Sequence, residues 1–166
     1  MKYLKKSFWA AAVIWVILPA CQDDEEVSRQ SLLIGAWSLD DQSIKKVTVS
    51  SGDNELELTE EEFIQYLAIQ GENINTGELR LFSENTTFTF AEDGSLLIEG
   101  IDNSEYDSGN WELSENQNQL LLRTSREVRT FDIRSLSSKR LEAESTFTQA
   151  DNGTLYQIDF VFLLTK

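Results

Sequence analysis

The sequence predicts a mainly β protein, an antiparallel up-and-down β-barrel of about eight or nine strands with one short α-helix inserted near residues 59–70. Three observations lead to this fold class. Apolar and polar residues alternate through the C-terminal segment, short polar turns separate similar runs upstream, and one stretch between residues 58 and 71 has helical spacing instead. The region after residue 30 contains no proline and no flexible linker, so we expect one domain, residues 31–166.

The last strand has the clearest pattern. From residue 156 onward every second residue is apolar, which is the period of a strand with one face in a core. The intervening positions are partly apolar too, so the other face is not fully polar. The residues assigned to the core face are Tyr156, Ile158, Phe160, Phe162 and Leu164.

Short polar turns join the strands that precede it. Asp93-Gly94 lies between the runs 87–90 and 96–98, and Asp-Gly in that position is a strong hairpin signal. Connections of this length join antiparallel neighbours, because a parallel crossover needs about a dozen residues or more. Closure of the meander into a barrel removes the two open edges of the sheet. The other turns are assigned to residues 115–118, 135–138 and 151–153.

Residues 58–71 predict the helix. Thr59 and Glu62 have the spacing of a capping box, and Gly71 is a typical C-terminal stop. The helix has one apolar side, which we expect to pack against the sheet or across a mouth of the barrel. A helix that closes the end of the barrel is favoured over a lid above a cavity. The apolar side consists of Phe63, Ile64, Tyr66 and Leu67.

A Gly-x-Trp-x-Leu pattern occurs twice, at residues 35–39 and 109–113. In each copy, glycine allows a strand to begin at a crowded bend, and the tryptophan and leucine point to the same face. The first copy resembles the motif that opens the barrel in lipocalins, and the second resembles a strand of small bacterial lipocalin-like lipoproteins. The resemblance covers about residues 32–164 and implies a calycin-type barrel. Residues 43–78 depart from it, because a simple meander would join its first two strands by a shorter loop.

The N-terminus has the three parts of a secretory signal, which we assign to residues 1–20. Lys2, Lys5 and Lys6 form a basic start, residues 8–18 are apolar, and small residues mark the cut. The apolar stretch is shorter than the about 20 residues that a membrane-spanning helix needs. The sequence therefore predicts export rather than a membrane span at this end.

The only cysteine of the chain follows this signal. Leu18, Pro19 and Ala20 precede Cys21, and the spacing resembles the lipobox of bacterial lipoproteins. The resemblance implies that Cys21 carries a diacylglyceryl group and an acylated amine, with chains such as palmitate, and anchors the protein in a Gram-negative cell envelope. Two or more acyl chains hold a protein stably at a membrane. An ordinary signal peptide with a stray cysteine is the alternative.

Residues 21–30 predict an acidic tether. Its four successive carboxylates, Asp23 to Glu26, must stay in water. They resemble the acidic run of some lipoproteins on the outer face of the outer membrane, and a plain solvated linker is the alternative. We expect a lipid anchor in the outer membrane, and the sequence leaves two locations for the domain, the periplasmic face and the external face.

Removal of residues 1–20 takes away three lysines and changes the formal charge from −15 to −18. Such a charge repels phosphate, which excludes nucleic acid as a partner.

Large aromatic side chains are numerous in the predicted strands. An eight-stranded barrel is either filled by its side chains or has room for one small ligand. Two interpretations stay open: the rings fill the core, or they surround a cavity that binds a small apolar or sugar-like molecule. The candidates for the barrel interior or the lining of a ligand site are Trp37, Phe88, Phe90, Trp111, Phe131, Phe160 and Phe162.

The sequence gives little support to catalysis. It contains no histidine, and its one thiol is assigned to the anchor, which excludes Ser-His, Cys-His and histidine-based metal sites. We expect no cofactor and no metal, and the acidic stretch 102–107 is interpreted as a polar loop because it lacks the spacing of a calcium loop. Hydrolysis by paired carboxylates is the remaining enzymatic alternative.

The function predicted from these features is that of a non-catalytic envelope lipoprotein that binds a small apolar or sugar-like ligand. The alternative is a module with a packed interior that docks or inhibits another envelope protein. Both functions use the same anchor and the same barrel, and they differ in whether the interior holds a ligand.

Overall fold

The computed structural model describes residues 28–71, 79–100 and 106–166. The predicted signal, its lipobox, Cys21 and most of the predicted tether lie outside the described residues. Within the described ranges, no helix is both long and apolar enough to cross a membrane.

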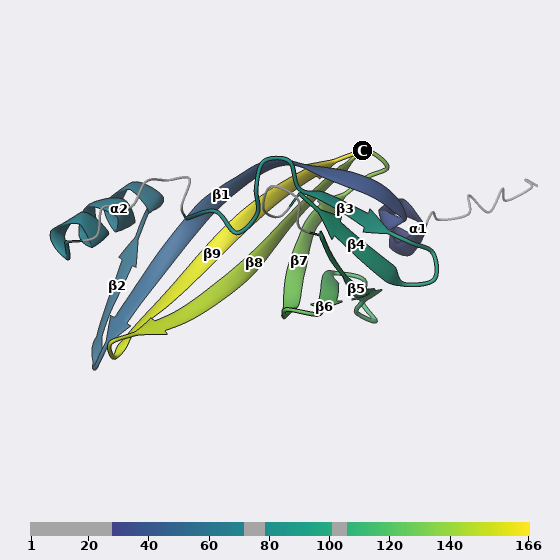
Figure 1. Ribbon diagram of the computed structural model, residues 1–166. Helices are drawn as coiled ribbons and strands as arrows, with labels where there is room; N and C mark the ends of the chain where they lie inside the picture. The colour runs from purple at the N-terminus through teal and green to yellow at the C-terminus, as the bar shows by residue number, and fades with distance from the viewer. Residues whose placement is uncertain (1–27, 72–78, 101–105) are drawn as a thin grey trace, which may run out of the picture.

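One antiparallel sheet contains all nine strands of the described ranges, and eight of them close a barrel (Figure 1). Neighbours follow the order β2-β1-β3-β4-β5-β6-β7-β8-β9, and the pairing of β1 with β9 closes the ring. The predicted up-and-down barrel is confirmed. The strands are β1 (Gly35–Ser51), β2 (Asn54–Leu58), β3 (Thr87–Phe90), β4 (Ser95–Glu99), β5 (Tyr106–Leu113), β6 (Gln119–Thr124), β7 (Val128–Leu136), β8 (Arg140–Asp151) and β9 (Thr154–Thr165).

The predicted hairpins are present, and their residues explain the turns. Gly94 has a φ of 83° between β3 and β4, and Asn152 and Gly153 have φ values of 45° and 82° between β8 and β9. Glycine and asparagine tolerate such angles better than other residues do. The alternation of β9 is confirmed as well, because Phe160, Phe162 and their like-facing neighbours are buried.

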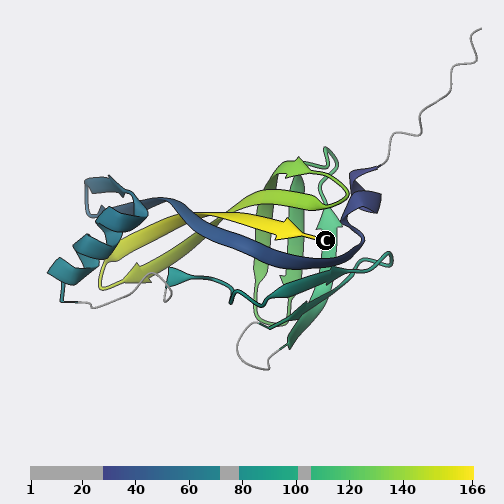
Figure 2. The same ribbon diagram turned by 90° about the horizontal axis from the view of Figure 1, so that it is seen from above.

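Three strands are longer than the barrel and continue beyond it as an arm (Figures 1 and 2). β1, β9 and β8 stay paired as far as the turns at their far ends, and β2 pairs with the last five residues of β1. The arm is therefore a four-stranded sheet in the order β2-β1-β9-β8. It accounts for the departure at residues 43–78 from the expected simple meander.

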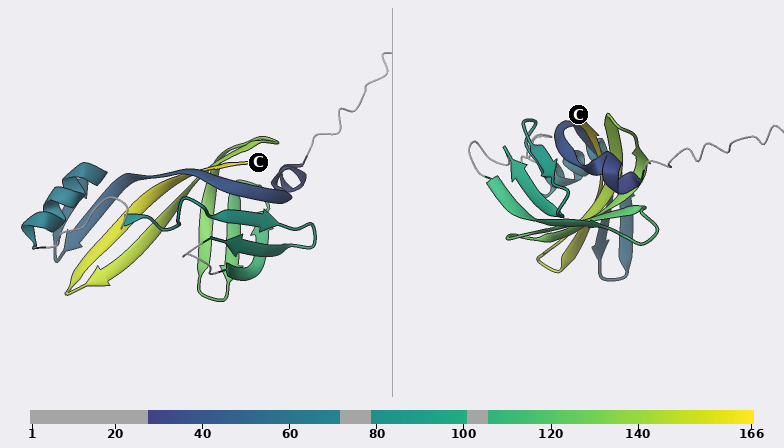
Figure 3. Two further views of the ribbon diagram at one scale, coloured as in Figure 1. Left: turned by 45° about the horizontal axis from the view of Figure 1, so that its top comes forward. Right: turned by 90° about the vertical axis from the view of Figure 1, so that its right-hand side faces the viewer.

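Helix α2 (Glu60–Ile69) forms as its capping signals predict. The Thr59 hydroxyl accepts a hydrogen bond from the Glu62 N–H, the Glu62 carboxylate accepts one from the Thr59 N–H, and Gly71 follows with a φ of 91°. The preferred placement at the end of the barrel was wrong. α2 packs against the arm, away from the barrel (Figures 1–3), because the hairpin of β1 and β2 carries the chain to the far end of the arm before the helix begins.

A second helix, α1 (Arg29–Leu33), covers the opposite end of the barrel (Figure 3). It begins within the segment that was predicted as tether. Trp37 of the first Gly-x-Trp copy donates from its indole nitrogen to the Leu33 carbonyl over 2.6 Å. The Lys166 ammonium lies 4.6 Å from the centre of the Trp37 ring and donates to two carbonyls of the same turn. These contacts fix both chain ends of the domain to one another.

The end of the barrel next to the arm is filled by Phe82, which lies in the segment between α2 and β3. Its ring contacts Phe88 at 5.2 Å and Phe162 at 5.7 Å between ring centres. Its N–H donates to the side-chain oxygen of Gln42 over 3.1 Å, which gives that oxygen of a buried residue a hydrogen-bond partner. A loop residue therefore plugs this end.

Gly109, in the second Gly-x-Trp copy, lies where the backbone of the neighbouring strand leaves no room for a side chain. A Cβ at Gly109 would lie 1.8 Å from the carbonyl oxygen of Arg123 on β6, which is far inside contact distance. We expect Gly109→Ala to lower the free energy of unfolding by about 3 kcal/mol, measured by urea unfolding. Asn110→Ala, at the exposed neighbouring position, is the control, and equal stability of the two variants would contradict the close approach.

A buried carboxylate on β5 gives a pH prediction. Asp107 is buried and accepts hydrogen bonds from the Ser125 hydroxyl and the Ser108 N–H. Burial alone would raise its pKa, but the hydrogen bonds from Thr124, Ser125 and Ser108 outweigh it and lower the pKa below 3.8. A lowered pKa in the folded state stabilises the fold above the unfolded value, and this contribution is lost as the pH falls through the folded value.

We therefore expect Asp107→Asn to be less stable than the parent at pH 7, with the difference shrinking as the pH falls below about 4. Urea unfolding at pH 7 and at pH 3 measures it. Asp40→Asn, at an exposed position, is the matched control, and a pH-independent effect of Asp107→Asn would contradict the assignment.

Candidate functional site

The seven aromatic residues proposed from the sequence all lie in the hydrophobic core of the barrel. None of them is more than 5% exposed. The structure places together Trp37, Phe88, Phe90, Trp111, Phe131, Phe160 and Phe162.

Contacts between these rings occupy the space inside the barrel. Phe90 meets Trp111 edge-on at 5.5 Å between ring centres, and Phe131 meets Phe162 at 5.2 Å. The gap that Phe88, Phe90, Phe131 and Phe162 line inside the barrel measures about 10 Å³, the size that a single water molecule needs. Of the two interpretations offered by the sequence, a core filled by rings fits this interior.

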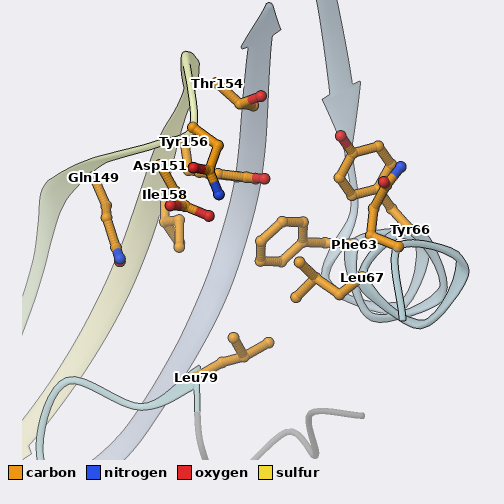
Figure 4. Close-up of a pocket in the computed structure, with 11 residues that line it drawn as sticks. Phe63, Tyr66, Leu67, Leu79, Gln149, Asp151, Thr154, Tyr156 and Ile158 are labelled. Carbon is orange, nitrogen blue, oxygen red and sulfur yellow. The ribbon is translucent and has the colours of Figure 1, made fainter. Parts of the chain in front are cut away.

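A larger space lies on the arm, in a groove of about 450 Å³ between α2 and the strands β8 and β9 (Figure 4). Its volume falls in the range of small-molecule sites. We call it the arm groove. Its lining residues are Phe63, Tyr66, Leu67, Gln70, Leu79, Gln149, Asp151, Asn152, Thr154, Tyr156 and Ile158.

The helix supplies the apolar wall of the arm groove. Phe63 and Leu67 are one turn apart on α2, and both are buried against the sheet. The Phe63 ring lies 6.0 Å from that of Tyr156 on β9 and 6.5 Å from that of Tyr66 on α2. In Figure 4 the Phe63 side chain points from the helix toward the strands. The two elements thus meet through aromatic rings.

The hairpin of β8 and β9 supplies the polar wall. Alternate residues of a strand share one face, so Gln149 and Asp151 of β8 lie on the same side as Thr154 and Tyr156 of β9. The register pairs Gln149 with Tyr156 and Asp151 with Thr154. A row of amide, hydroxyl and carboxylate groups therefore runs beside the aromatic rings.

The arm groove is nearly free of charge. Burial, together with the nearby Tyr66 side chain and the Asp151 carboxylate, raises the pKa of the Tyr156 phenol. Tyr156 therefore stays neutral at physiological pH and can both donate and accept a hydrogen bond. Asp151 is the one acidic residue among the lining residues. Such a site suits an uncharged ligand with both an apolar face and polar groups.

The sequence predicted the helix and the strand that line the arm groove, but it did not predict that they lie next to each other. Tyr156 and Ile158 were placed on the core face of the last strand, and Phe63 on the apolar side of the helix. Neither pattern indicates that β9 begins in the arm and enters the barrel only after residue 158. The turn at Gly52-Asp53, between the alternating runs 47–49 and 56–58, was a usable hairpin signal for the arm.

The acidic stretch at 102–107 lies mostly outside the described residues, and its last member, Asp107, is engaged by hydroxyl and amide donors. Across the described ranges there is no cluster of three or more acidic or cysteine side chains placed to hold a metal ion.

Comparisons with known proteins add a distant structural likeness. No protein-family model matches the sequence, and no curated protein sequence does. Among solved structures, the chain is similar to lobster apocrustacyanin A1, with 10% sequence identity and a TM-score of 0.43. The match covers 86% of this chain and 64% of the crustacyanin chain, so this chain spans less than two thirds of that protein. The assignment of the barrel fold rests on the strand pairing described above.

Proposed function

We propose that this protein is a lipid-anchored, non-catalytic binding protein of the cell envelope, which takes a small, uncharged, sugar-like ligand in the arm groove. The observation that carries the proposal is the contrast between two spaces. The gap between the rings inside the barrel measures about 10 Å³, whereas the arm groove offers about 450 Å³. The proposed binding site therefore lies on the arm and not inside the barrel, where the aromatic residues of the sequence predicted it.

The chemistry of the lining selects the ligand class. Tyr66 and Tyr156 offer ring faces and edges to an apolar surface, and the buried Phe63 ring packs against both. The amides of Gln70 and Gln149 can each donate and accept hydrogen bonds. A sugar ring has an apolar face and hydroxyls around its edge, which match these two walls. A fatty acid would place its carboxylate beside Asp151 and leave the amides without partners.

The absence of a second acid in the lining supports binding rather than hydrolysis. A glycosidase needs two carboxyl groups on either side of the bond that is cleaved. Asp151 is the sole carboxylate among the residues that line the arm groove. The sequence also contains no histidine. We therefore propose that the ligand leaves the arm groove unchanged.

The proposed anchor rests on the sequence alone. Cys21 follows Leu18, Pro19 and Ala20 with the spacing of a lipobox, and seven residues, 22–28, separate it from α1. A tether of that length would hold the barrel close to the membrane surface.

A binding experiment tests the arm groove. Full-length protein is titrated by calorimetry with glucose and maltose, and with glucuronate and palmitate as charged and apolar comparisons. We expect the neutral sugars to bind best and Tyr156→Ala to weaken their binding about tenfold through loss of the ring contact and the hydroxyl. Gln149→Ala should weaken it as well.

Tyr106→Ala is the matched control, because Tyr106 is a tyrosine that is 70% exposed on β5 and contributes nothing to the arm groove. Preferential binding of palmitate, or sugar binding that Tyr156→Ala leaves unchanged, would contradict the proposed site.

The anchor has a separate test. We expect Cys21→Ser to abolish acylation and to move the protein from the membrane fraction of a Gram-negative host to the soluble fraction, because the thiol is the attachment point for the diacylglyceryl group. Mass spectrometry of the purified N-terminus measures acylation. Ser28→Ala in the same segment should remain acylated, and an acylated, membrane-bound Cys21→Ser protein would overturn the assignment.

A second candidate function is the docking of another envelope protein. The filled barrel favours it, because a barrel without room for a ligand presents only its outer surfaces and its arm for recognition. The two candidates use different parts of the arm and do not exclude each other.

A further inference from the structure

Strand β8 loses one of its two neighbours where the arm leaves the barrel. β7 pairs with β8 only between Asp132↔Glu144 and Leu136↔Leu141. At the point of separation the Ser145 hydroxyl donates to the Thr130 carbonyl over 2.8 Å, in place of a bond between the two backbones. From residue 146 to residue 151, β8 pairs with β9 alone among the described strands. Figure 1 shows the two strands diverging there.

The hairpin register determines which backbone groups face outward along this segment. The two-residue turn makes Asp151↔Thr154 a hydrogen-bonded pair, and such pairs alternate with non-hydrogen-bonded ones. Thr146, Thr148 and Ala150 therefore direct their N–H and C=O groups away from β9. All three residues are exposed. We call this row of backbone groups the β8 edge.

The two edges of the arm differ in their protection. Natural sheets guard an open edge with charged side chains, which discourage pairing with another chain. The β2 edge carries Glu55 and Glu57, and Glu57 forms an ion pair with Lys46 at 2.8 Å. The three residues of the β8 edge are two threonines and an alanine. The β8 edge therefore lacks the guard that the opposite edge has.

A cavity at the start of the β8 edge contains a buried cation with a free donor. The space between β7 and β8 measures about 450 Å³ and includes Arg129 and Phe147 among its lining residues. The Arg129 side chain is 11% exposed, and its guanidinium lies between the rings of Phe82 and Phe147, at 5.7 and 6.0 Å from their centres.

The guanidinium of Arg129 is neutralised but not fully hydrogen-bonded. Its Nε and Nη2 donate to the carboxylate of Glu127. Its Nη1 is buried and has no hydrogen-bond partner among the described residues, which is a costly state for a polar atom. Because Glu127 already supplies the negative charge, a neutral oxygen such as a backbone carbonyl suffices as acceptor.

We propose that the β8 edge is a docking site for an extended segment of a partner polypeptide, which adds a strand to the arm and accepts a hydrogen bond from Arg129 Nη1 through one of its backbone carbonyls. This inference deepens the second candidate function and rests on it. Backbone donors and acceptors at every second residue match an extended chain and no compact ligand. Arg129 Nη1 lies at one end of the β8 edge and therefore determines where the partner segment begins or ends.

The partner is a different protein and not a second copy of this chain. Two copies would each bring a formal charge of −18 once residues 1–20 are removed, and net charge of this size opposes self-association. The same charge attracts a partner with basic residues beside its extended segment. The partner is thus an extended strand flanked by lysine or arginine.

A selection of peptides tests the docking site. A phage-displayed library of random twelve-residue peptides is panned on the full-length protein, and the best binder is synthesised with blocked ends and measured by fluorescence anisotropy. We expect the binder to be an alternating, strand-forming sequence with basic residues at its ends. On binding, the amides of Thr146, Thr148 and Ala150 should gain protection from hydrogen exchange.

Variants distinguish the β8 edge from other surfaces. Thr148→Pro removes an outward N–H without breaking a bond to β9, and Arg129→Lys keeps the charge but removes the free Nη1 donor. Each should weaken the peptide about tenfold, the effect of one hydrogen bond. Glu55→Pro makes the same change on the opposite edge of the arm and should leave binding unchanged. Ala150→Pro replaces Thr148→Pro if the latter is poorly folded.

Each remaining outcome contradicts the proposal in a defined way. Recovery of no peptide, or of peptides whose binding Thr148→Pro and Arg129→Lys leave unchanged, overturns the β8 edge as a docking site. In the second case the docking function itself survives at another surface. A dimer of the full-length protein that Thr148→Pro dissociates would show that the occupant is a second copy.

Discussion

The pairing of β1 with β9 is the interaction on which the rest of the structure depends. It runs from Ser38↔Thr165 to Ser51↔Thr154, with two shifts of register that bend β1 on the way. At one end it closes the barrel, and at the other it extends past the barrel as the centre of the arm (Figure 2). β8 follows β9 along its whole length, whereas β7 does not follow β8. The arm groove and the β8 edge both result from this difference in length.

The barrel and the arm consequently have different roles. Aromatic rings fill the barrel, α1 and Lys166 cover one end, and Phe82 fills the other. A closed and filled barrel is a rigid support, because tightly packed interiors deform little. The arm has one face of its sheet partly covered by α2, and its β8 edge carries no charged side chain at Thr146, Thr148 and Ala150. We expect ligands and partners to bind where the sheet has backbone groups without a neighbouring strand or a groove without filling side chains. Both features lie on the arm.

Local signals in the sequence predicted the strands, the hairpins and the capping of α2, because these depend on nearby residues. Alternation in β9, Asp93-Gly94 and the pair Thr59 and Glu62 each encode one such element. The point at which a strand leaves its neighbour is not encoded in this way. The alternation of β9 continues unchanged from barrel to arm, and Phe82 plugs the barrel from a segment with no periodic pattern. The arm groove is lined by residues 63–70 and residues 149–158, which are far apart in the sequence. Only the tertiary structure shows that these two segments lie side by side.

The central claim is that β1 and β9 remain paired beyond the barrel, and cross-strand nuclear Overhauser effects test it most directly. In the arm, Val49↔Tyr156 and Val47↔Ile158 are paired residues. Their flanking hairpins make them non-hydrogen-bonded pairs, whose Cα atoms lie about 4.5 Å apart with the α protons facing each other. We predict strong α-proton contacts for both pairs in the free protein. Their absence, with the contacts of the barrel strands retained, would show that the arm does not form and would contradict both proposed binding surfaces.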